Sequence, residues 1–142
     1  MIRKGLSIIA LVFLVYVIVS FYMGHEEVSQ YDHLEQNANK IITGSELQTW
    51  ATNLLDSYPP TNTWFILTPS ELGTNFPQQL LGIASHRLGP YISVYLLKDR
   101  PRSLRLWWGS GFLGASGFEI GPTNFVSNDR EWQPGVYFFS HN

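Results

Sequence analysis

The stretch YISVYLLKDRPRSLRLWW, residues 91–108, contains two β-type runs that are joined by a charged turn. These runs, 91–97 and 103–108, are rich in β-branched, aromatic and leucine residues, which is the composition of strands. Two further runs of this kind follow, SGFEIG at 116–121 and GVYFFS at 135–140. The segments between the runs are too short for the crossover helices that parallel strands require. We therefore predict an antiparallel β-meander of about four strands.

Side-chain alternation divides the second run between two faces of this sheet. Leu104, Leu106 and Trp108 fall on one face, and Arg105 and Trp107 fall on the other. One of the two adjacent tryptophans should therefore lie opposite the core. Such a tryptophan can mark a partner surface, or it can pack beneath the 122–134 loop.

Candidate binding residues come from the pairing of the second and third runs. If they pair around Phe112, Arg105 lies opposite Glu119. This arrangement predicts either a plain cross-strand ion pair or a contact to a sugar or carboxylate beside Trp107. A groove beside Trp107 or Trp132 would serve a ligand or partner. The candidate partner-binding residues are thus Trp107, Arg105, Glu119 and Trp132.

A helix is predicted over residues 45–58, before the strands. Ser45 and Gln48 have the spacing of a capping box, and Pro59 follows the last turn. Apolar side chains recur at helical spacing along one face: Leu47, Trp50, Ala51, Leu54, Leu55 and Tyr58. A helix followed by sequential strands indicates an α+β domain in which this amphipathic helix covers one face of the sheet.

Two weaker signals lie between this helix and the strands. The run TWFIL, residues 63–67, has a β-type composition. Thr68 and Glu71 form a second capping box, with Pro69 at the first helical position. We expect a short helix to begin there.

The run WWGSGFLGASG, residues 107–117, contains the pattern Gly109-x-Gly111-x-x-Gly114. A dinucleotide loop needs a helix directly after these glycines, and no helix-forming sequence follows them. We interpret the glycines as residues that permit positive φ in a wide hairpin loop. The sequence therefore predicts no nucleotide there.

Residues 5–22, GLSIIALVFLVYVIVSFY, contain no charged residue. As a helix they span about 27 Å, close to the thickness of about 30 Å of a hydrocarbon core. Arg3 and Lys4 precede them, and Glu26 and Glu27 follow them. Because the positive side normally stays inside, we predict a single-pass anchor in the cell membrane with a cytoplasmic N-terminus. The rest of the chain would then lie outside the cytoplasm.

A cleaved signal peptide is the alternative reading of this segment. Its apolar region would be shorter and would end at a small-x-small site, and the nearest approach is Ile18-x-Ser20. With a retained anchor, the predicted division is an anchor at 1–23, an acidic stalk at 24–42 and an extracytoplasmic α+β domain at 43–142. Whether the segment is cleaved stays open.

The first ten residues, MIRKG-LSIIA, place a basic tail and a glycine directly before the apolar helix. This arrangement resembles the N-terminus of type IV pilins and pseudopilins, which are processed after that glycine. Those families usually carry a glutamate at the fifth position after the cut, where this chain has Ala10. The resemblance covers about the first 25 residues and implies an assembly subunit that packs through its apolar segment.

Bulk composition excludes several classes of function. A net charge of −2 offers no basic surface for nucleic acid. The chain has no cysteine, which excludes disulfides, thiolate metal sites and thiol nucleophiles. We predict no cofactor, no metal and no catalytic residue, and an enzyme is not favoured. The expected function is a membrane-anchored interaction or structural domain with a protein partner in the cell envelope; a pilin-like subunit and a glycan-binding module are the alternatives.

Overall fold

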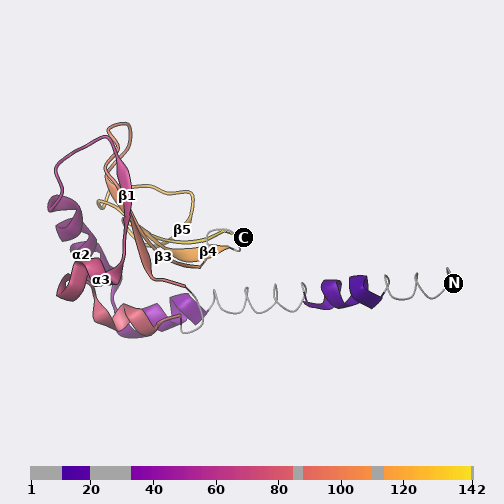
Figure 1. Cartoon of the computed structure of the whole chain (residues 1–142). Helices are drawn as coiled ribbons and strands as arrows, with labels where there is room; N and C mark the ends of the chain where they lie inside the picture. Colours follow the sequence, from indigo (N-terminus) through magenta and orange to yellow (C-terminus); the bar gives the residue numbers. More distant parts are fainter. Residues whose placement is uncertain (1–10, 20–32, 85–87, 110–113, 142) are drawn as a thin grey trace. The chain divides into compact units, whose positions relative to one another are not determined.

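The computed structural model describes residues 11–19, 33–84, 88–109 and 114–141 (Figure 1). Residues 11–19 are helical with exposed side chains, while the remainder of the predicted membrane segment lies outside the described residues. Among the residues that are described, no helix combines the length and apolarity that crossing a bilayer requires. The anchor therefore stays a prediction. Leu34–Asn142 form a compact unit.

A six-stranded antiparallel sheet forms the centre of this unit. Its strands are β1 (Trp64–Leu67), β2 (Tyr91–Tyr95), β3 (Ser103–Gly109), β4 (Ala115–Ile120), β5 (Arg130–Gln133) and β6 (Val136–His141). The order across the sheet is β1-β2-β3-β4-β6-β5. The α+β class and the antiparallel pairing are confirmed, and the four predicted runs form β2, β3, β4 and β6.

The predicted number of strands was too low. The run at 63–67 joins the sheet as β1, and β5 lies within the predicted 122–134 loop. β5 has the sequence REWQ, and its two charged residues and lack of apolar alternation leave no strand signal. Because β6 pairs with both β4 and β5, the last strands do not follow meander order.

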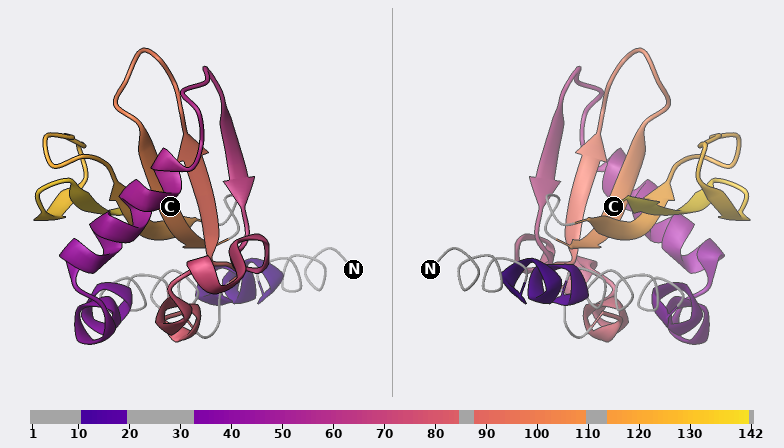
Figure 2. Two further views of the ribbon diagram at one scale, coloured as in Figure 1. Left: turned by 90° about the vertical axis from the view of Figure 1, so that its left-hand side faces the viewer. Right: turned by 90° about the vertical axis from the view of Figure 1, so that its right-hand side faces the viewer.

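Most of the hydrophobic core lies on one face of the sheet, and helix α2 (Gly44–Asp56) lies across it (Figure 2), while Tyr137 and Phe139 are buried on the other face. The core side chains that are fully buried on this helix-covered face are Ile92, Val94, Leu104, Leu106, Trp108, Phe118, Ile120 and Val136. From α2, the side chains of Leu47, Ala51, Leu54 and Leu55 are buried. The predicted amphipathic helix therefore packs on the face that contains Trp108, and the predicted alternation in β3 is confirmed.

The start of α2 differs from the sequence prediction. Thr43 is the N-cap and forms a capping box with Glu46, two residues before the predicted pair. The hydrogen bonds from Thr43 lower the pKa of Glu46, because they stabilise its charged form. Gln48, which was expected in the cap, donates instead to the carbonyl oxygens of Gly121 and Pro134 beside the sheet.

The second capping box is confirmed. Thr68 donates from its backbone N–H and its hydroxyl to Glu71, both at 2.7 Å, at the start of α3 (Pro69–Leu72). Two 3₁₀ turns follow, η1 (Gly73–Asn75) and η2 (Gln78–Gly82).

Residues 33–41 are also helical. Leu34, Ala38 and Ile42 are buried, and Glu35 forms an ion pair with Arg130 of β5. From Leu34 onward, these last turns of the predicted stalk are thus part of the compact unit, while the proposed boundaries at 24 and 42 stay a prediction.

Candidate functional site

The second face of the sheet carries aromatic side chains over β1, β2 and β3. We call this surface the aromatic face and define it by Trp64, Ile66, Tyr91, Tyr95 and Trp107, which the pairing of the three strands places on one side. Trp64 and Ile66 are 57% and 46% exposed. The rings of Trp64 and Tyr95 stack at 6.4 Å, and those of Tyr91 and Trp107 lie 4.8 Å apart. Two aromatic pairs therefore cover this face from its edge strand towards its centre.

Trp107 and Trp108 occupy contrasting environments. Trp108 is completely buried on the helix-covered face, where its ring meets Phe118 edge-on. Trp107 is half-buried on the aromatic face, and its indole N–H donates to the hydroxyl of Ser93 at 3.0 Å. This hydrogen bond and the contact with Tyr91 fix the orientation of the Trp107 ring.

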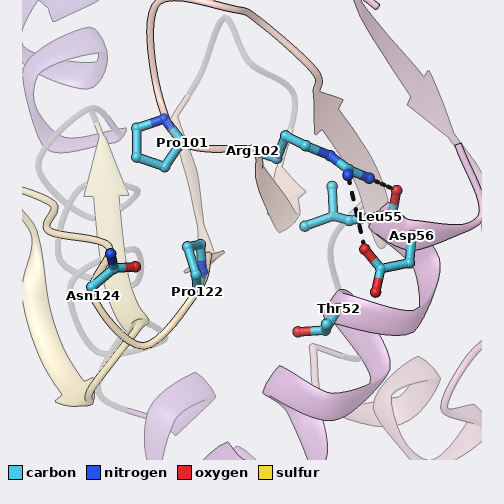
Figure 3. A pocket seen from close by; sticks show the side chains of 7 residues that line it. All are labelled: Thr52, Leu55, Asp56, Pro101, Arg102, Pro122 and Asn124. Atoms are coloured by element: carbon cyan, nitrogen blue, oxygen red, sulfur yellow. Dashed lines mark hydrogen bonds and ion pairs between the residues drawn. The ribbon is translucent and has the colours of Figure 1, made fainter. Parts of the chain in front are cut away.

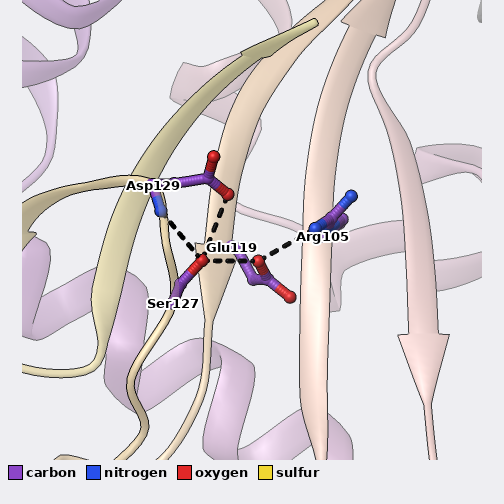
Figure 4. A network of polar contacts seen from close by, with 4 residues as sticks. All are labelled: Arg105, Glu119, Ser127 and Asp129. Carbon is purple, nitrogen blue, oxygen red and sulfur yellow. Dashed lines mark hydrogen bonds and ion pairs between the residues drawn. The ribbon is translucent and has the colours of Figure 1, made fainter.

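Beside Trp107, Arg105 and Glu119 form a cross-strand ion pair (Figure 4). Their Cα atoms are partners in the β3–β4 ladder, as pairing around Phe112 predicts, and a guanidinium nitrogen lies 3.0 Å from a Glu119 carboxylate oxygen. Glu119 is only 3% exposed. The register prediction is thus confirmed, and the pair is considerably more buried than an ordinary surface ion pair.

The 122–129 loop adds two polar groups to this pair. The Ser127 hydroxyl lies 3.1 Å from carboxylate oxygens of both Glu119 and Asp129. A hydroxyl has one hydrogen, so it donates to one carboxylate at a time. It also accepts the backbone N–H of Asp129 at 3.3 Å within the loop, while its contact with Glu119 ties the loop to β4. The polar cluster is therefore built from two strands and one loop.

Arg105 remains charged in this environment. Burial disfavours its charged form, but the hydrogen bond and the negative charge of Glu119 outweigh burial and raise the pKa of Arg105. Its guanidinium also lies 5.0 Å from the ring centroid of Phe139. Because the side chain of Arg105 is 30% exposed, a partner that docks on the aromatic face would meet a fixed positive charge.

The structure brings together three of the four predicted partner-binding residues. Arg105, Trp107 and Glu119 are neighbours on the same face of β3 and β4. Trp132 packs against Phe118 at 5.3 Å, on the helix-covered side of the sheet. It therefore cannot share a groove with Trp107. Alternation could not show this, because β5 was not recognised as a strand.

A separate pocket lies where α2 approaches the turns before β3 and after β4 (Figure 3). It has a volume of about 360 Å³, and its lining residues are Thr52, Leu55, Asp56, Pro101, Arg102, Pro122 and Asn124. Arg102 donates to the carbonyl oxygens of Leu55 and Tyr58 at the end of α2, and it lies 3.8 Å from Asp56. Its donors thus give a charged partner to the Leu55 carbonyl, which also accepts the Tyr58 N–H, and to the Tyr58 carbonyl just after the helix, which is a structural role.

Replacing Arg102 by Ala should lower the free energy of unfolding by about 1–3 kcal/mol, because the last carbonyls of α2 lose a charged donor. Urea denaturation followed by tryptophan fluorescence measures this change. Lys98→Ala is the matched control, since Lys98 is an exposed basic residue of the same turn, and its effect should stay below about 0.5 kcal/mol. Equal effects of the two substitutions would contradict the capping role.

The glycine pattern lies in the β3–β4 hairpin. Gly109 and Gly114 have φ angles of 130° and 103°, which confirms the prediction of positive φ. β4 begins at Ala115, so a strand follows the pattern. Residues 110–113 lie outside the described part.

Within the described ranges, no group of three or more His, Cys, Asp or Glu residues is placed to hold a metal ion. Comparison of the chain with protein-family models, with curated proteins and with solved structures found no match.

Proposed function

We propose that this chain is a membrane-anchored domain that binds a protein partner outside the cytoplasm through its aromatic face. The observation that carries the proposal is the contrast between the two faces of the sheet. α2 covers one face, whereas Trp64 and Ile66 on the other are about half exposed beside two aromatic pairs. Grouped apolar side chains at a surface are typical of an interaction site.

The residue types on this face also favour a protein partner. Tryptophan, tyrosine and arginine are the residues that most often dominate the binding energy of protein interfaces. Here Trp64 and Tyr95 lie at the rim, and Arg105 adds an oriented charge near the centre. Because Arg105 and Trp107 are already held by Glu119 and Ser93, they lose little side-chain entropy on binding.

The anchor is part of the proposal and rests on the sequence. The apolar segment 5–22 is long enough to span a bilayer, and the charges on its two sides favour a cytoplasmic N-terminus. When two proteins are anchored in the same envelope, their effective concentration is high. A small interface is then sufficient for them to bind each other.

A photo-crosslinking residue at Tyr91, in the full chain and in its native membrane, tests the partner surface. Asn53 is the matched control, because it is exposed on α2 and lies away from the aromatic face. We expect a discrete adduct with another protein from position 91 and none from position 53. Tyr95→Ala should reduce that adduct several-fold without a comparable loss of thermal stability.

Equal labelling at both positions, or none at position 91, would contradict the proposal. An adduct with a polysaccharide would instead favour the glycan-binding alternative. The specific observation behind that alternative is that the stacked Trp64 and Tyr95 rings lie on a partly exposed face next to a charged pair.

A further inference from the structure

The geometry points to a second copy of this chain as the partner of strand β1: the two β1 strands pair antiparallel about a two-fold axis at Phe65. This contact joins two six-stranded sheets into one continuous sheet. It involves the edge of the sheet and shares Trp64 and Ile66 with the aromatic face, so it is tested separately from the partner proposed for that face.

β1 is the end strand of the sheet, and its only neighbour in the strand order is β2. Leu96 donates its backbone N–H to the carbonyl of Thr63 at 3.0 Å, so these two residues form a hydrogen-bonded pair. Hydrogen-bonded and non-hydrogen-bonded pairs alternate in an antiparallel ladder. Phe65 and Leu67 therefore bond to β2, and the backbone N–H and C=O groups of Trp64 and Ile66 point to the open edge.

This edge is short, with four residues, but it carries none of the charged side chains, prolines and bulges that prevent pairing. Exposed edges are usually protected by charged side chains, proline or a bulge, and β1 has the sequence WFIL in a regular register with β2. Among the described residues, the only other hydrogen bond to these outward groups is a long one of 3.4 Å from the Thr63 hydroxyl to the Trp64 carbonyl. The outward groups are thus available to another strand.

Self-pairing matches both the backbone and the side chains. With Phe65 opposite Phe65 of the second copy, Trp64 of each copy lies opposite Ile66 of the other. Trp64 and Ile66 are the residues with outward backbone groups, so the two pairs exchange four hydrogen bonds. The same register places the exposed Trp64 and Ile66 side chains against each other on the aromatic side.

The neighbouring registers fit less well. Centring the axis on Ile66 pairs Trp64 with Thr68, whose N–H already donates to Glu71 and whose successor is a proline. Centring it on Trp64 pairs Ile66 with Asn62, which lies outside β1. A pairing register shifted by one residue would place side chains from the aromatic face of one copy beside side chains from the helix-covered face of the other. A second copy also brings no charge repulsion, because β1 is uncharged.

The first test uses the full chain in detergent micelles, with Ile66→Pro and Ile66→Thr compared by sedimentation equilibrium. Proline removes an N–H that β2 does not use, and proline is tolerated where an edge strand faces solvent. Threonine keeps this N–H and favours strands. We expect a wild-type dimer whose dissociation constant rises at least about tenfold in Ile66→Pro and clearly less in Ile66→Thr. A monomeric wild type, or a dimer that Ile66→Pro leaves unchanged, would overturn the inference.

Disulfide trapping in membranes tests the register, and the absence of native cysteine means that any bridge joins introduced residues. Phe65→Cys should form a covalent homodimer on mild oxidation, because opposed residues of a non-hydrogen-bonded pair are about 4.5 Å apart at Cα. Ile66→Cys is the control, since its two copies would be more than about 8 Å apart. Trapping at 66 but not at 65 would overturn the register. Because Ile66 also belongs to the aromatic face, the wild-type chain separates the two contacts: a Tyr91 adduct whose mass differs from twice that of the chain contains a protein other than a second copy.

Discussion

Replacing Arg105 by Met is expected to lower the free energy of unfolding by about 3 kcal/mol. The substitution leaves the carboxylate of Glu119, which is 3% exposed, without its positively charged partner. Breaking a buried ion pair from one side costs about 3–5 kcal/mol. The lower end applies because Arg105 is 30% exposed, so water can enter its place, and because Ser127 can still donate to the carboxylate. Urea denaturation of the variant and the wild type measures the difference.

The double variant Arg105→Met and Glu119→Leu is the control for this expectation. It removes both charges, and replacing a buried pair by apolar residues of similar volume is often close to neutral. We expect it to recover most of the stability that Arg105→Met loses, with a coupling energy of about 2 kcal/mol between the two positions. If the free-energy losses of the two single substitutions add up to the loss of the double variant, the ion pair contributes no coupling energy.

Trp108→Ala is expected to cost about 3–5 kcal/mol, because it leaves a large cavity where the completely buried ring packs beside Phe118. This loss approaches the whole stability of a typical small domain. Trp107→Ala should cost about 1–2 kcal/mol, since the ring is half-buried and makes one hydrogen bond. Thermal unfolding of the two variants followed by circular dichroism gives the comparison. If the two substitutions were equally destabilising, the assignment of the faces would be wrong.

Trp108→Phe provides an intermediate control for the same site. The indole nitrogen of Trp108 is buried and has no hydrogen-bond partner among the described residues. Phenylalanine removes this unpaired N–H as well as part of the ring volume. We therefore expect Trp108→Phe to lose clearly less stability than Trp108→Ala.

Much of the sheet could be predicted from sequence because its central strands carry strong local signals. β3 alternates between leucine or tryptophan on one face and arginine or tryptophan on the other, and this pattern alone assigns Trp108 to the core side. The Arg105–Glu119 pairing followed from the symmetry of the hairpin around Phe112. Short-range patterns of this kind need no knowledge of the rest of the chain.

The features that were missed depend on contacts between distant segments. β5 is a strand only because β6 offers it an edge, since its own residues do not alternate. The role of Arg102 requires a turn beside β3 to meet the end of α2, 44 residues or more away in sequence. Trp132 was grouped with Trp107 because, without β5, its face could not be assigned.

The position of β6 has a consequence for the order in which the chain is made. β6 is the strand farthest along the sequence, yet it lies inside the sheet between β4 and β5. A growing chain that has supplied only β1 to β4 therefore exposes the backbone of β4 and the apolar side chains beside it. This edge must wait for residues 136–141 to leave the ribosome, and incomplete chains with open strand edges are prone to aggregation. Synthesis stalled before β6 would thus yield a form in need of a chaperone, even though α2 and most of the core residues have already been made.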